Sequence, residues 1–112
     1  MPEIHAHIVA QVILLARETS SRGAGNPAAE AELREFIAAQ NEDDQYALVA
    51  IAWIGRESFA PQEWDEAIRT AREEATTSTE DYLTGMTLLA DYLEDGLEAL
   101  GISATDAEDD LL

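Results

Sequence analysis

The chain has 112 residues, with 24 acidic side chains against six basic ones, for a formal net charge of −18. This length suits a single domain with one hydrophobic core, and the 46% hydrophobic content is that of a folded protein. The acidic balance argues against binding to nucleic acid or to an anionic membrane surface, because both are bound chiefly through Lys and Arg. The chain contains no Cys, which excludes disulfides and thiolate chemistry. No stretch has the length of a membrane helix or the pattern of a signal peptide, so we expect a soluble, cytoplasmic protein, and no motif calls for a cofactor.

The first predicted element is an amphipathic helix over residues 3–18, with one apolar face formed by Ile4, Ile8, Val12 and Leu15. A loop of small residues follows over residues 19–27, which contain two glycines and a proline. A second helix is expected over about residues 27–40, because Pro27 is preset for a first helical position.

The most apolar stretch of the chain is Tyr46–Ile54. A run of this kind is typical either of a buried strand or of a buried helix. Asn41 can cap a helix, residues 42–44 place carboxylates in its first turn, and Gly55 stands where a helix commonly stops. These signals favour a central buried helix over about residues 43–55.

Two further helices are predicted after this run. Pro61 opens one with Trp64, Ala67, Ile68, Ala71 and Ala75 on its apolar side. A short turn follows Ser78, and the last helix extends from Thr87 to a stop at Gly101. The predicted fold class is therefore all-α: a compact single-domain bundle of about five helices over residues 1–102, followed by an acidic, solvated tail over residues 103–112.

Arg56 is the first candidate functional residue. It directly follows the apolar run and is the only basic residue between Arg34 and Arg69. One interpretation is a structural anchor for helix-end carbonyls or a carboxylate, since Arg tolerates burial through paired hydrogen bonds. The other is a receptor for an anion.

A row of carboxylates on the last helix is the second candidate. Helical spacing places them on one arc opposite the leucine face, namely Asp91, Glu94, Asp95 and Glu98. We interpret this arc as the solvated outside of the helix, or else as a docking face for a basic partner or a site for a hard cation. The two histidines, His5 and His7, lack the spacing of a metal site, so we assign neither catalytic residues nor metal ligands.

Short motifs in a characteristic order cover about residues 30–101: Leu33–Ile37, Asn41–Gln45, Leu48–Arg56, Trp64, Tyr82–Gly85 and Leu88–Leu97. In these motifs the chain resembles the bacterial domain-of-unknown-function 3775 family (DUF3775). The family pattern usually has Gly-Asp where this chain has Glu57-Ser58, and Thr-Pro where it has Met86-Thr87. The resemblance implies a small bacterial cytoplasmic helical domain and brings no established activity or catalytic residues.

The leading functional interpretation is a non-enzymatic interaction or structural domain. Surplus apolar surface on the first or last helix would let the domain self-associate. The expected partner is therefore a second copy of the chain or another protein. One alternative is a metal-dependent hydrolase that uses the pairs Glu63/Glu66 and Asp91/Glu94. The other is an acidic adaptor for a basic partner protein.

Overall fold

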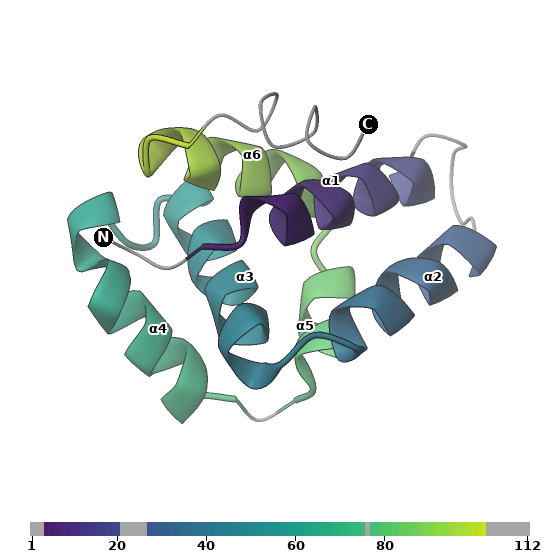
Figure 1. Cartoon of the computed structure of the whole chain (residues 1–112), viewed down its shortest axis with the longest axis horizontal. Coiled ribbons are helices and arrows are strands. Elements are labelled where there is room, and N and C mark those ends of the chain that lie inside the picture. Colours follow the sequence, from purple (N-terminus) through teal and green to yellow (C-terminus); the bar gives the residue numbers. More distant parts are fainter. Residues whose placement is uncertain (1–3, 21–26, 76, 103–112) are drawn as a thin grey trace.

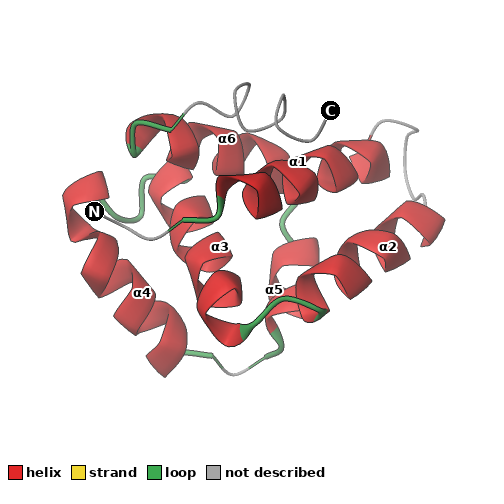
Figure 2. Cartoon of the chain, viewed as in Figure 1, coloured by secondary structure: helices red, strands yellow, loops and turns green. Residues whose placement is uncertain are grey.

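The computed structural model describes residues 4–20, 27–75 and 77–102. Its elements in chain order are α1 (Ala6–Ser20), α2 (Pro27–Ala38), α3 (Glu42–Gly55), the 3₁₀ turn η1 (Pro61–Glu63), α4 (Trp64–Glu73), α5 (Thr79–Thr84) and α6 (Leu89–Ala99). Every element in these ranges is helical, which confirms the all-α class (Figure 2). The segment after Ser78, expected as a turn, forms the short helix α5 in addition to the expected five.

Two segments predicted from the sequence lie wholly or mostly outside the described residues. These are most of the loop over residues 19–27 and the whole acidic tail over residues 103–112. Within the described ranges, no helix combines the length and the apolar character needed to cross a membrane.

Helix α3 is the centre of the fold, as the sequence predicts (Figure 1). Its start is fixed by Asn41, whose side-chain oxygen accepts a hydrogen bond from the Asp44 N–H at 2.9 Å. Every residue from Ala47 to Ile54 is buried. Helices α4, α5 and α6 pack against α3. Helix α1 packs against α2 and α6, and α2 packs against α5. Because α3 is covered from more than one side, its sequence is apolar all round rather than on one stripe.

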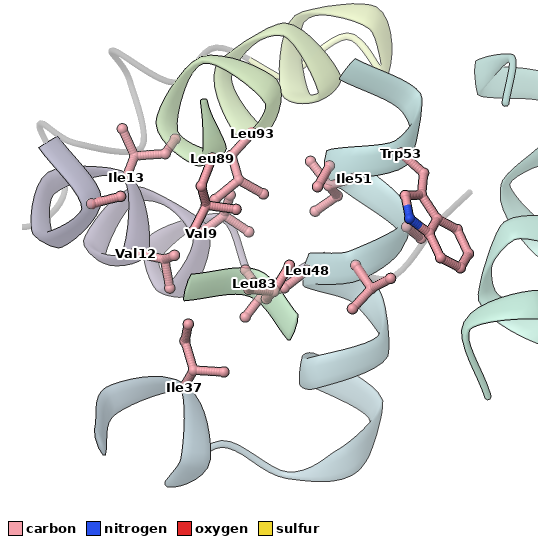
Figure 3. Packing of buried hydrophobic residues seen from close by; sticks show 14 of the residues in the cluster. Val9, Val12, Ile13, Ile37, Leu48, Ile51, Trp53, Leu83, Leu89 and Leu93 are labelled. Carbon is pink, nitrogen blue, oxygen red and sulfur yellow. The ribbon is translucent and has the colours of Figure 1, made fainter. Parts of the chain in front are cut away.

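Figure 3 shows how the core is divided by α3. Ile51 faces the buried residues of α1 and α6, including Ile13 and Leu93, which are fully enclosed. Trp53 leaves α3 on the opposite side, toward α4. The larger part of the core therefore lies between α3, α1 and α6, and a smaller aromatic part lies between α3 and α4.

The contact between α3 and α6 depends on two glycines within the helices. A Cβ atom added at Gly55 would overlap the carbonyl oxygen of Tyr92, and one added at Gly96 would overlap the carbonyl oxygen of Ile51. Residue 55 meets residue 92 and residue 51 meets residue 96, so the two helices approach in opposite chain directions. Gly55 is the last residue of α3, as predicted, and it also serves this close approach.

The residue that stops α3 in a left-handed conformation is Glu57, with φ of 67°. The N–H groups of Glu57 and Ser58 donate to the carbonyls of Ile54 and Trp53, at 3.0 and 2.8 Å. Helix α6 ends with the same pair of bonds, but there the left-handed residue is Gly101, with φ of 83°, as predicted. Position 57 therefore carries a side chain in a conformation that favours glycine.

We predict that Gly96→Ala destabilises the protein by about 2 kcal/mol or more and lowers Tm by roughly 10 °C. The new methyl group would meet the backbone of Ile51, so α3 and α6 would have to separate, and this cost exceeds the ~1 kcal/mol gain in helix propensity. Gly85→Ala is the matched control, because its nearest neighbour would be 3.4 Å away. Thermal unfolding measures both, and an equal response of the two variants would contradict a close helix contact.

We also predict that Glu57→Gly raises the free energy of unfolding by about 0.5–1 kcal/mol, because it removes the cost of a left-handed L-residue. Glu57→Gln removes the same charge but keeps a side chain, so it should change stability by less than about 0.5 kcal/mol. Urea denaturation distinguishes the two. Equal stabilisation by Gly and Gln would assign the effect to charge and not to backbone conformation.

Candidate functional site

Arg56 is exposed at the C-terminal end of α3. Its Nε donates to the Ser58 hydroxyl at 3.0 Å. The carbonyls of Trp53 and Ile54 at this helix end already accept backbone N–H groups, so they do not need the Arg56 side chain. Binding of an anion by Arg56 stays a prediction.

The row of carboxylates on α6 does not form a common site with other ligands. Asp91, Asp95 and Glu98 are exposed, whereas Glu94 is half-buried and forms an ion pair with Arg17 of α1. In the part of the chain that the structure describes, no three Asp, Glu or His side chains are grouped so that they could hold a metal ion. A docking role for this row stays a prediction.

The carboxylate pairs suggested for a hydrolase are not gathered either. Glu63 accepts a hydrogen bond from the Ala60 N–H at 2.7 Å and thereby fixes the turn before α4, while Glu66 lies exposed on α4. Glu94 of the other pair is held by Arg17. Helix α4 and helix α6 both pack on α3, but the four carboxylates do not converge on one described site.

The structure instead reveals an aromatic groove on the α4 side of α3. It encloses about 150 Å³ and is lined by three segments of the chain: Tyr46, Val49 and Trp53 from α3, Ala71, Glu74 and Ala75 from the end of α4, and Thr77, Thr79 and Tyr82 at α5. A cavity of this size accepts one small ring or the end of one long side chain. We call this site the aromatic groove.

Trp53 forms the floor of the aromatic groove and is held by two other aromatic residues. Its indole N–H donates to the Tyr82 hydroxyl at 2.9 Å, and the two rings meet edge to face with centroids 6.5 Å apart. Phe59 stacks on Trp53 with a centroid separation of 5.6 Å. Trp53 is only 8% exposed, whereas Tyr82 is 39% exposed. Tyr82 therefore forms the accessible wall, and its hydroxyl keeps a proton that it can donate.

The electrostatic character of the aromatic groove is negative. Among the described residues, Glu74 is the only charged one that lines the groove. The C-terminal end of α4, which also lines it, carries partial negative charge from its carbonyl groups. The guanidinium carbon of Arg72 lies 5.5 Å from the centroid of the Tyr46 ring. Arg72 belongs to a neighbouring hollow of about 230 Å³, which it lines with His5, Asp44 and Trp64, so it does not line the aromatic groove.

His5 and His7 do not act together in this neighbouring hollow. His5 Nδ1 lies 2.6 Å from a carboxylate oxygen of Asp44 and so ties the segment before α1 to the first turn of α3. The ring of His7 is 6.1 Å from that of His5 and is exposed. The His5–Asp44 contact therefore links the segment before α1 to α3.

Sequence reasoning did not find the aromatic groove. The sequence predicts Trp53 within the central buried helix, which is confirmed, and Tyr82 in the turn after Ser78, which forms α5. It does not predict their contact, which joins residues 29 positions apart. The only available signal was the set of aromatic residues at positions 46, 53 and 82 beside helix ends. Among the described residues, no polar or charged side chain is buried, so the polar side chains that line the aromatic groove are all within reach of solvent.

Comparison with curated proteins and with solved structures gave no match. The family model described as a protein of unknown function, DUF3775, matches residues 30–102, which is more than half of the chain. These residues include most of α2, all of α3 through α6 and every described lining residue of the aromatic groove. The chain therefore belongs to the DUF3775 family of proteins of unknown function.

Proposed function

We propose that this domain is a non-enzymatic protein-interaction module that receives a partner's side chain in the aromatic groove. The observation that carries the proposal is the exposed Tyr82 wall above a Trp53 floor that is already fixed by a hydrogen bond. Tyr and Trp are the residues most often found at the energetic centres of protein interfaces. A rigid floor also lowers the entropy cost of binding, because no ring has to be ordered when the partner arrives.

The proposal predicts that peptides selected from a random library on the immobilised protein depend on the aromatic groove. Ala75→Trp, which fills the groove and leaves the Trp53–Tyr82 bond intact, should weaken the selected peptides roughly tenfold or more. Tyr82→Ala should do the same by removing the wall. Leu88→Ala is the control, because it shortens an exposed side chain that does not line the groove.

Fluorescence anisotropy of the labelled peptides measures these affinities, and circular dichroism verifies that each variant is folded. Selected peptides that bind Ala75→Trp and Tyr82→Ala as tightly as the parent protein would refute the proposal.

The second candidate function is self-association. Leu14 of α1 is 40% exposed and Leu88, just before α6, is 49% exposed, and these two apolar side chains support this candidate. Exposed leucines of this kind can be covered by a second copy of the chain.

Self-association predicts a sedimentation coefficient that rises with protein concentration. Leu14→Glu or Leu88→Glu should reduce this rise, because each places a charge in the apolar contact. Ala38→Glu is the control, since it adds the same charge at an exposed position of α2. A strict monomer at every concentration reached would eliminate this candidate.

A further inference from the structure

We infer that the side chain received by the aromatic groove is an arginine from a basic segment of the partner protein. This inference rests on the proposed function and adds the chemistry of the partner. It follows from three properties of the groove: its aromatic lining, the single charged residue among its described lining residues, and its size.

The aromatic surface suits a guanidinium group. Trp53, Tyr46 and Tyr82 line three parts of the groove, and the electron-rich faces of Trp and Tyr attract cations. Arginine also stacks flat on such rings, which lysine does not. The molecule already contains one example beside the groove, where the Arg72 guanidinium lies 5.5 Å from the centroid of Tyr46.

The charge around the groove selects a cation over a neutral side chain. Glu74 supplies a carboxylate among the lining residues, and it follows directly after the last residue of α4, whose C-terminal end also attracts positive charge. No cationic side chain lines the groove in the described part of the chain. The net charge of −18 adds a long-range attraction for basic segments and repels acidic ones.

The volume limits the occupant to one side chain. About 150 Å³ admits a guanidinium with the end of its aliphatic stem, but not a helix or a strand. The rest of the basic segment would then lie on the protein surface outside the groove.

The inference is tested with three small probes: N-acetyl-arginine amide, N-acetyl-citrulline amide, which has the same shape without the charge, and N-acetyl-phenylalanine amide. Binding is followed by NMR through the shifts of the Trp53 indole N–H and the backbone N–H groups of Thr77 and Thr79. We expect the arginine probe to bind about fivefold or more tightly than the citrulline probe. Glu74→Gln should weaken the arginine probe about threefold.

Glu73→Gln is the matched control for Glu74→Gln. It removes the same charge from the neighbouring residue of α4, which does not line the groove, so it should change the affinity less than Glu74→Gln does. Equal losses for the two variants would overturn the inference, because they would indicate diffuse attraction rather than a site. Equal binding of arginine and citrulline, preferred binding of phenylalanine, or no shift at Trp53 would each overturn it as well.

The two proposals can fail separately. A library selection that gives groove-dependent peptides without arginine would uphold the interaction module and refute its basic partner. A selection without groove-dependent peptides would refute both. Arginine-rich peptides that lose binding in Ala75→Trp and in Glu74→Gln, but keep it in Glu73→Gln, would support both.

Discussion

The close approach of α3 and α6 is the constraint on which the rest of the structure depends. Gly55 and Gly96 let each helix lie against a backbone carbonyl of the other, at Tyr92 and Ile51, so the contact is fixed by main-chain atoms. Main-chain atoms cannot rotate out of the way as side chains can, so the position of α3 along α6 is defined within narrow limits. Once α3 is placed, Ile51 is directed into the α1–α6 side of the core, and Trp53 is directed to the α4 side, where the aromatic groove forms (Figure 3).

The charged side chains of the described residues lie outside the hydrophobic core. Among the described residues no charged side chain is buried, so the core is held by apolar packing. Several arginines link helices at the surface: Arg17 to Glu94, Arg34 to Asp81, and Arg72 to Asp43 at 3.8 Å. Exposed pairs of this kind contribute little to stability. The large excess of carboxylates therefore has its main physical effect on association, through repulsion of acidic partners and attraction of basic ones.

Local signals predicted much of the fold, because helix caps and apolar spacing are properties of neighbouring residues. Asn41 starts α3 and Gly101 ends α6 as predicted. The sequence did not predict contacts between residues that lie far apart along the chain. Gly55 was visible at a helix end, but the carbonyl of Tyr92 that explains it lies on another helix. Glu57 is a local exception. It adopts a left-handed conformation against its own preference, with its N–H bonded to Ile54 and that of Ser58 bonded to Trp53. The aromatic groove combines α3, α4 and α5, and no local pattern specifies such a combination.

The extent of the family match bears on which surface carries the function. Helix α1 lies outside the matched residues 30–102, although it packs against α2 and α6 and contributes buried residues such as Val12 and Ile13 to the core. Leu14, one of the two exposed leucines in the described ranges, belongs to this unmatched helix. Every lining residue of the aromatic groove lies within the match, as do the glycine contacts that position α3. A function shared by the family has to be carried by the matched part of the chain. The aromatic groove meets that condition in full, whereas a surface that needs Leu14 does not.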